Sequence, residues 1–236
     1  MAVWLLDEDA IWFPNPFFGD EDGMVATGGD LSAERLIVAY EHGFFPWFAC
    51  EISGEKQPIN WYCPLNRFVI FPNDIHISHS MWQLMKSNKY EVTFNKDFEG
   101  VIRGCSEVNG RNQKDGAWLG EDMIEAYQRL HDMNRAMSVE VWEREEQGDG
   151  GRRLVGGLYG VMSGVVFCGE SMFSRVSNAS KLALIKLAET LSHIDGSLID
   201  CQFETPHLES MGGRYISYEV YLCHLHNKHK DKECVP

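Results

Sequence analysis

Two short stretches gather side chains that could carry out chemistry. The first, VFCGESMFSRVSNASKLALIKLAE, brings carboxylate, hydroxyl, thioether and guanidinium groups to one junction. Its apolar start predicts a strand, Gly169 to Arg175 a polar loop, and its end an amphipathic helix from about Asn178. The second, LIDCQF, predicts a strand that carries an acid and an amide two residues apart. Together these groups could bind a hydroxyl or a cation through hydrogen bonds.

Each acid in these stretches has a functional and a plainer interpretation. Asp200 and Gln202 are expected on one face of a strand, where Asp200 could fix which end of the Gln202 amide faces outward. The same pair could simply tie down a loop. Glu170 could form an ion pair with Arg175 or contact a hydroxyl or cation of a substrate.

Aromatic residues in loops bounded by glycine and proline form a second group of candidates. Phe45 and Trp47 lie in GFFPWF, and Trp118 precedes a predicted helix in GAWLGEDM. Such tryptophans could stack on nucleobases or anchor their loops. A further apolar set fits either a core or a pocket, because a sequence does not show volume: Leu158, Phe167, Met172 and Leu184.

The elements that must position these residues alternate between helix and strand. Helices are predicted at residues 32–43, 79–87, 97–106 and 120–134, and from about residues 178, 206 and 217. Strands are predicted at 90–95, 137–145 and 197–203, as a pair within 57–72, and as a hairpin within 154–170. This order indicates an α/β (α+β) fold with a mixed sheet flanked by helices. A soft boundary near Asn66 divides a small N-terminal domain, 1–66, from a larger domain, 67–236.

Composition narrows the class of function. The net charge of -14 over 236 residues argues against general nucleic-acid binding and favours a basic partner. No apolar run approaches the roughly 20 residues that cross a bilayer, and the acidic N-terminus does not resemble a signal peptide. Seven scattered cysteines without a CxxC pair predict neither a disulfide framework nor a zinc cluster. A reducing cytoplasm is the simplest setting, and no metal or cofactor motif is present.

Four long stretches carry a family resemblance: ATGGDLSAERLIVAYEHGFFPWF, GAWLGEDMIEAYQRLH, GGLYGVMSGVVFCGESMFSRVSNASKLAL and LIDCQFETPHLESMGGRYI. They resemble the leucyl/phenylalanyl-tRNA–protein transferases of bacteria, from about Ile11 to Leu222. The resemblance implies transfer of Leu or Phe, and less well Met, from aminoacyl-tRNA to proteins beginning with Arg or Lys. The product would carry a signal for N-degron degradation in the cytoplasm. The implied fold is a small N-terminal domain joined to a GNAT-like acyltransferase domain.

The resemblance also implies roles for individual residues. The site for the terminal adenosine would include Tyr40, Phe45, Trp47 and Trp118. The pocket for the aminoacyl side chain would include Leu158, Phe167, Met172 and Leu184. The polar, catalytic centre would be formed by Glu170, Asp200 and Gln202. The partners are therefore the 3′ end of aminoacyl-tRNA and a basic protein N-terminus, for an enzyme expected to act as a monomer.

The expected mechanism is aminolysis of an ester that is already activated, so neither ATP nor a metal is needed. The attacking α-amine has a pKa of about 7.7–8.0, which leaves roughly a tenth to a sixth of it neutral at pH 7. Positioning should therefore dominate, with Gln202, oriented by Asp200, aligning the amine. Three alternatives remain: an acyl-CoA N-acyltransferase, a non-catalytic module for RNA 3′ ends, and aminoacyl transfer to a peptidoglycan precursor.

Few basic residues are available for the body of the tRNA. The family's basic patch corresponds to HSMWQLMKSNKYE, which offers Lys86 and Lys89. Additional help is expected from a scattered set: Arg67, Lys96, Arg103, Arg111 and Lys114. We therefore expect recognition mainly at the 3′ end.

Overall fold

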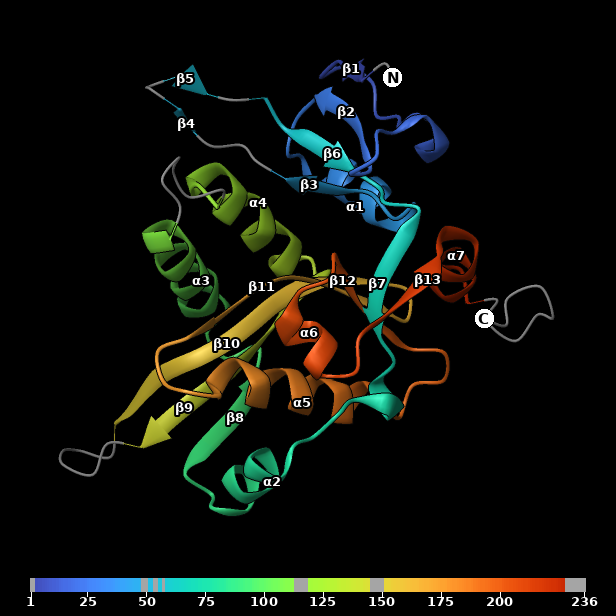
Figure 1. Ribbon diagram of the computed structural model, residues 1–236. Helices are drawn as coiled ribbons and strands as arrows, with labels where there is room; N and C mark the ends of the chain where they lie inside the picture. The colour runs from blue at the N-terminus through green and yellow to red at the C-terminus, as the bar shows by residue number, and fades with distance from the viewer. Residues whose placement is uncertain are drawn as a thin grey trace.

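The chain forms two main sheets that are joined through residues 63–65 (Figure 1). The computed structural model describes residues 3–47, 51–52, 55–56, 58–112, 119–144 and 151–227. The first sheet contains, in spatial order, β1 (Trp4–Leu6), β2 (Met24–Gly28), β6 (Asn60–Tyr62) and β3 (Phe45–Trp47). The same part of the chain contains η1 (Pro16–Phe18), α1 (Ala33–Glu41) and the small pair β4 (Glu51–Ile52) and β5 (Glu55–Lys56).

The helix predicted at residues 32–43 is confirmed as α1, and its ends follow from local chemistry. The Ser32 hydroxyl accepts a hydrogen bond from the backbone N–H of Arg35 at 3.3 Å, which satisfies one free amide of the first turn. Gly43 follows with φ +80, a left-handed conformation that glycine adopts readily. This end leads the chain directly into β3, which carries Phe45 and Trp47.

The second sheet has seven strands, which confirms the predicted mixed sheet. Its spatial order is β13 (Arg214–Ser217), β7 (Asn66–Ile70), β12 (Leu198–Gln202), β11 (Val166–Ser174), β10 (Arg152–Ser163), β9 (Ala136–Arg144) and β8 (Tyr90–Phe94). Within this sheet β11 and β12 pair in parallel, and the other neighbours are antiparallel. The predicted strands at 57–72 belong to different sheets, because β6 joins the first and β7 the second.

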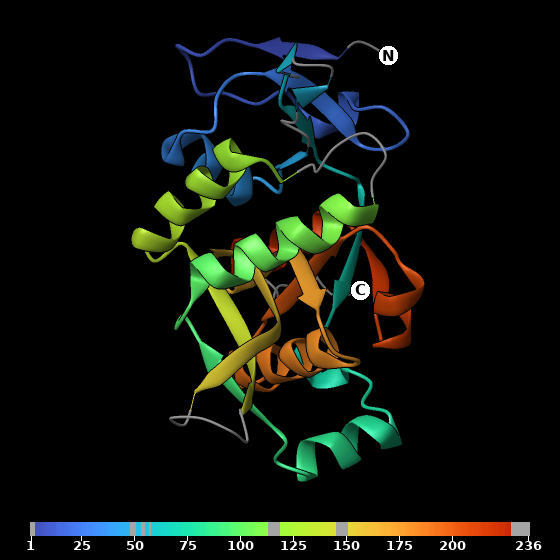
Figure 2. The same cartoon turned by 90° about the vertical axis from the view of Figure 1, so that its left-hand side faces the viewer.

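Helices cover both faces of the seven-stranded sheet (Figure 2). On one face lie α3 (Phe98–Asn112) and α4 (Glu121–Asp132), and on the other α5 (Ala179–Leu191). Two apolar clusters follow this division: Tyr159 of β10 packs with α3 and α4, whereas its neighbour Leu158 packs with α5. The remaining helices are η2 (Pro72–Asp74), α2 (His79–Lys86), α6 (Pro206–Ser210) and α7 (Tyr218–Leu225).

The polar loop predicted from Gly169 to Arg175 is wrong. Strand β11 continues to Ser174, because its backbone stays paired with β10 as far as Gly156 opposite Ser174. Backbone pairing here outweighs the polar character of the side chains. The smaller N-terminal and larger C-terminal parts agree with the predicted architecture, whereas the boundary at Asn66 stays a prediction.

Two chain-wide features bear on the expectations from composition. Among the described helices, none is long and apolar enough to cross a membrane. Cys63, Cys105, Cys168 and Cys201 are free thiols. Cys223 is disulfide-bonded, although the spacing of the cysteines predicted no disulfide framework.

Candidate active site

A β-bulge places Glu170. Ser171 of β11 pairs with Tyr159, and Gly169 pairs with the next residue of β10, Gly160, so Glu170 is the extra residue between them. A bulge bends its strand and redirects a side chain, which is why bulges are frequent beside active sites. The side chain of Glu170 therefore does not follow the regular alternation of side chains between the two faces of the strand.

A second bulge lies on the neighbouring strand β12. Asp200 pairs with Val69 and Gln202 with Phe68, so Cys201 is the extra residue. Gln202 itself adopts φ +57, in the left-handed region that few non-glycine residues occupy. Both polar stretches that the sequence singled out therefore lie at local irregularities of the same sheet.

The two strands separate where these bulges begin. The ladder between β11 and β12 ends at Cys168 opposite Asp200, although β11 continues to Ser174. Beyond this point, residues of both strands line a cavity of about 270 Å³. The separation of paired strands therefore creates space in the middle of the sheet.

This first cavity has mainly apolar walls and brings together the residues predicted for the aminoacyl side chain. All four predicted residues line it: Leu158, Phe167, Met172 and Leu184. It is also lined by residues that the sequence analysis did not select, namely Tyr159, Ile199, Cys201, Thr205, His207 and Leu208. Ile199 could have been selected from its place beside Asp200 in LIDCQF. His207 and Leu208 could not, because only the fold brings α6 against the same cavity.

A second cavity of about 240 Å³ has aromatic walls. Phe45 and Trp47 line it, as predicted for a ring-binding site, together with Pro46 and Phe203. The rings of Trp47 and Phe203 lie 5.0 Å apart at 31°. Phe203 was missed, although it directly follows Gln202. Trp118 lies outside the described residues.

The two cavities meet at three residues. Glu170, Ser171 and Gln202 line both of them. An apolar side chain held in the first cavity and a planar ring held in the second would therefore place the atoms between them beside a carboxylate, a hydroxyl and an amide. This junction is the feature that can do chemistry.

Glu170 has an unusual environment for a carboxylate. Its Oε2 accepts a hydrogen bond from the Tyr127 hydroxyl at 2.6 Å, and the hydroxyls of Tyr127 and Tyr40 lie 2.8 Å apart. Because Tyr127 donates to Glu170, Tyr40 donates to Tyr127. Burial raises the pKa of Glu170 to about 7, although the tyrosine hydrogen bonds oppose the shift. Its Oε1 is buried and has no hydrogen-bond partner.

Two interpretations from the sequence change at this point. The ion pair between Glu170 and Arg175 does not form, because Arg175 donates to Glu107 at 3.0 Å and to the Leu154 carbonyl. Tyr40, predicted beside the adenosine, is only 2% exposed and lines neither cavity. Its hydroxyl lies against the Tyr127 hydroxyl and, together with it, favours the ionised form of Glu170.

Asp200 is held by several groups. Its Oδ1 accepts from the backbone N–H of Gln202 at 2.9 Å, and its Oδ2 accepts from the Tyr221 hydroxyl at 2.9 Å. The Arg67 guanidinium lies 3.8 Å from the same Oδ2. Asp200 thus orients Gln202 through its backbone, whereas the sequence predicted contact with the side-chain amide.

Three of the seven basic residues expected to contact tRNA are buried or paired with acids. Arg67 is fully buried, so its prediction as a tRNA contact is wrong. Arg103 pairs with Glu99 and Glu121, and Lys89 pairs with Glu143 at 3.4 Å. Lys114 lies outside the described residues, as does the side chain of Arg111.

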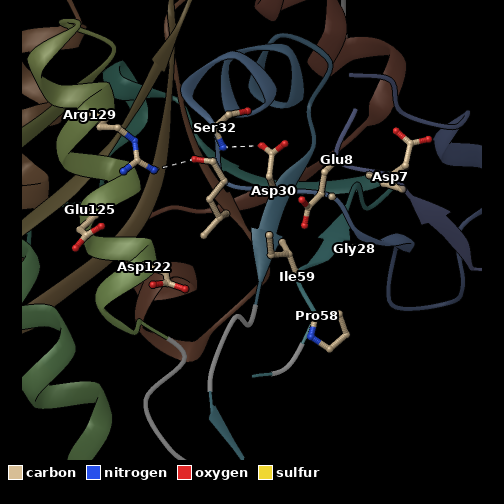
Figure 3. Close-up of a pocket in the computed structure, with 13 residues that line it drawn as sticks. Asp7, Glu8, Gly28, Asp30, Ser32, Pro58, Ile59, Asp122, Glu125 and Arg129 are labelled. Atoms are coloured by element: carbon tan, nitrogen blue, oxygen red, sulfur yellow. Dashed lines mark hydrogen bonds between the residues drawn. The ribbon is translucent and has the colours of Figure 1, made fainter. Parts of the chain in front are cut away.

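A larger cavity lies elsewhere. Figure 3 shows this space of about 770 Å³ between the N-terminal sheet and α4. Its acidic lining residues are Asp7, Glu8, Asp30, Asp122 and Glu125, and Arg129 donates to the Leu31 carbonyl at its edge. It shares no lining residue with the two cavities above. Within the described ranges, no group of three or more His, Cys, Asp or Glu side chains could hold a metal ion.

Comparison with known proteins assigns the family. A family model described as leucyl/phenylalanyl-tRNA protein transferase matches residues 69–226, and a model of the N-terminal domain of that transferase matches residues 29–65. The leucyl/phenylalanyl-tRNA–protein transferase of Flavobacterium psychrophilum is 46% identical over 210 residues, covering 89% of this chain and 93% of that protein. The protein of the same name from Pseudomonas fluorescens is 45% identical over 227 residues, covering 95% of this chain and 94% of that protein.

This similarity extends over both parts of the fold, including all residues of the junction. The chain is therefore an enzyme of the aminoacyltransferase class. It belongs to the leucyl/phenylalanyl-tRNA–protein transferase family.

Proposed function

We propose that this protein transfers Leu or Phe, and less well Met, from aminoacyl-tRNA to the N-terminal Arg or Lys of acceptor proteins. The observation that carries the proposal is the junction, where an apolar and an aromatic cavity share Glu170, Ser171 and Gln202. An aminoacyl-adenosine has the matching form: an apolar side chain and a planar base on either side of an ester. The names of the relatives agree with this donor.

The donor would occupy both cavities at once. The aminoacyl side chain enters the space beside Leu158 and Phe167, and the adenine stacks on Trp47. Val and Ile carry their bulk at Cβ, close to the junction, where a narrow entrance to the cavity would clash with the branched carbon. A difference of about one methyl group gives only about 1–3 kcal/mol, so selection among side chains is partial.

The acceptor amine would approach from the polar side of the junction. Gln202 aligns it, and the Glu170 carboxylate, which lines both cavities, accepts one of its protons. The pKa of Glu170 is about 7, and the pKa of the amine is about 7.7–8.0. Because the two pKa values are similar, Glu170 can take up a proton from the amine near neutral pH. The neutral amine nitrogen then bonds to the ester carbonyl carbon, the bond from that carbon to the ribose oxygen breaks, and a second proton of the amine passes to the ribose oxygen, which leaves as a hydroxyl. No metal or ATP enters this scheme.

The wider setting follows from the same chemistry. The net charge of -14 favours a cationic chain start over the polyanionic body of tRNA, so donor recognition rests mainly on the 3′ end. We propose a monomer acting in the cytoplasm, where aminoacyl-tRNA is made. There the transferred residue would mark the acceptor protein for N-degron degradation.

Labelled leucyl-tRNA tests the proposal directly. Peptides that begin with Arg, Lys or Ala and are otherwise identical are incubated with the enzyme, and transferred label is counted. We expect transfer to the Arg and Lys peptides and none to the Ala peptide. Replacement of leucyl-tRNA by acetyl-CoA serves as the control for the acyl-CoA alternative. Transfer to none of the peptides, or equal transfer to all three, contradicts the proposal.

A further inference from the structure

One buried arginine connects the walls of both cavities. Arg67, the second residue of β7, is fully buried. Its Nη2 donates to the carbonyl of Gly43, just before β3 of the aromatic cavity. Its Nη1 lies 3.8 Å from the Oδ2 of Asp200. The side chain therefore reaches from the N-terminal sheet to the acid that holds the Gln202 turn.

Aromatic rings enclose this guanidinium. Its central carbon lies 4.6 Å from the centre of the Tyr221 ring and 5.3 Å from the centre of the Phe45 ring. A guanidinium is attracted to the face of an aromatic ring. Burial opposes the charge, but the carboxylate of Asp200 and its neighbours raise the pKa of Arg67 above its usual value. The charge of Arg67 is therefore retained although the side chain is fully buried.

The contacts of Asp200 explain what this charge does. One carboxylate oxygen is used by the backbone N–H of Gln202, and the other by the Tyr221 hydroxyl. A buried carboxylate needs such compensation to remain in place. Arg67 and Tyr221 thus act on one oxygen, and the left-handed turn at Gln202 depends on the other.

We propose that Arg67 is a positioning residue for aminoacyl transfer. It fixes the position of Asp200, and through Asp200 the position of the turn at Gln202, relative to Phe45 in the wall of the aromatic cavity. The inference deepens the proposed function and rests on it. Arg67 lines neither cavity, so it acts through Asp200 and not by touching the substrate.

Lysine cannot reproduce this arrangement. The planar fork of arginine contacts the Gly43 carbonyl and approaches Asp200 with separate nitrogens while its faces lie against two rings. The single ammonium of lysine has no such fork or face. Arg67→Lys therefore keeps the positive charge but loses the planar guanidinium and its separate contacts to Gly43 and Asp200.

The test measures kcat and KM for leucine transfer from leucyl-tRNA to a peptide that begins with Arg. Arg67→Lys should lower kcat roughly tenfold or more, with KM for both substrates within about twofold. Tyr221→Phe should lower kcat in the same way, because it removes one donor to Asp200 and keeps the ring. It also decides the question if Arg67→Lys fails to fold.

A double variant with Asp200 distinguishes a positioning role of Arg67 from a general effect on protein stability. In single-turnover measurements on Asp200→Asn enzyme, adding Arg67→Lys should change the rate by no more than about twofold, because the shared partner is already altered. Arg35→Lys is the matched control: Arg35 is also fully buried and lies 3.5 Å from its partner Asp30. It should lower stability without lowering kcat.

The outcomes distinguish the two claims. Wild-type kcat in both Arg67→Lys and Tyr221→Phe overturns the positioning role. Losses that multiply in the Arg67→Lys, Asp200→Asn double variant also overturn it, since they indicate independent effects. Absence of transfer by the wild-type enzyme itself refutes the proposed function instead.

Discussion

At the scale of single residues, two acids at one junction have different surroundings. Asp200 is compensated by a backbone amide, a tyrosine hydroxyl and a nearby guanidinium. Glu170 receives one hydroxyl on Oε2 and has none on Oε1. Enzymes often assign different roles to paired carboxyl groups in this way. Here, Asp200 is suited to hold structure and Glu170 to exchange a proton.

Glu170→Gln should stabilise the protein in a pH-dependent manner. The folded-state pKa of about 7 exceeds the ordinary 4.5, so the folded wild type holds a proton that the unfolded chain releases between these values. Its stability therefore falls as pH rises from 4.5 to 7. Glutamine lacks this titration, so the advantage of the variant should be about 2 kcal/mol larger at pH 8 than at pH 5, allowing for partial exposure to the cavities. Urea unfolding at both pH values measures it.

The same substitution should abolish most of the activity. Loss of the proton acceptor lowers the transfer rate roughly 10²–10⁴-fold, even though the variant is more stable at pH 8. Glu107→Gln removes an exposed carboxylate that pairs with Arg175 and serves as the control. A Glu170→Gln enzyme with the transfer rate of the wild type, or with the same stability difference at both pH values, would refute the proton-acceptor role.

Residue types were more predictable than their partners. The spacing of Asp200 and Gln202 indicated a polar centre, but the contact between them runs through the backbone, because Gln202 is left-handed. Arg67 was expected at the surface and is buried. Both outcomes depend on neighbours that are distant in sequence, such as Gly43 and Tyr221, which a local pattern does not include.

At the scale of elements, periodicity and turn chemistry predicted most helices and strands. The hairpin predicted within residues 154–170 is formed by β10 and β11, and the chain turns at Gly164, which has φ +58. The polar residues after Gly169 suggested a loop, but the strand continues. A β-bulge leaves no clear signal in the alternation of side chains. The position of Glu170 was therefore beyond local prediction.

Gly160→Ala should damage the bulge that aims Glu170. A Cβ at this position would lie 2.2 Å from the Cys168 carbonyl oxygen and 2.5 Å from the Phe167 ring, so the backbone must move. We expect a loss of stability of about 1–3 kcal/mol and a loss of transfer activity. Gly169→Ala is the control for stability, because its Cβ would meet its nearest neighbour at an ordinary 3.4 Å. Equal unfolding midpoints for the two variants would contradict the role given to Gly160.

At the scale of the whole molecule, the mixed sheet was predictable and its opening was not. The order of helices and strands indicated the architecture, but not that β11 and β12 pair in parallel and then separate. The cavities exist because of that separation. Volume depends on the arrangement of α5, α6 and β3 together, and no segment alone contains that information.

Net charge should determine how salt affects the two substrates. With a charge of -14 and Arg103 and Lys89 already paired, few phosphate contacts are available. The KM for leucyl-tRNA should therefore depend only weakly on salt, and a leucylated acceptor-stem minihelix should react about as well. The KM for an Arg-initiated peptide should rise with salt, because its attraction to the acidic surface is screened. A steep salt dependence for the tRNA alone would contradict this division.

The most direct measurement is a crystal structure with a leucyl-adenosine analogue in which a stable amide replaces the ester. The account predicts the leucyl side chain beside Leu158 and Phe167, the adenine on Trp47, and the amide carbonyl between Glu170 and Gln202. An analogue bound in the acidic cavity beside Asp30 and Glu125, or bound with both junction cavities empty, would contradict it.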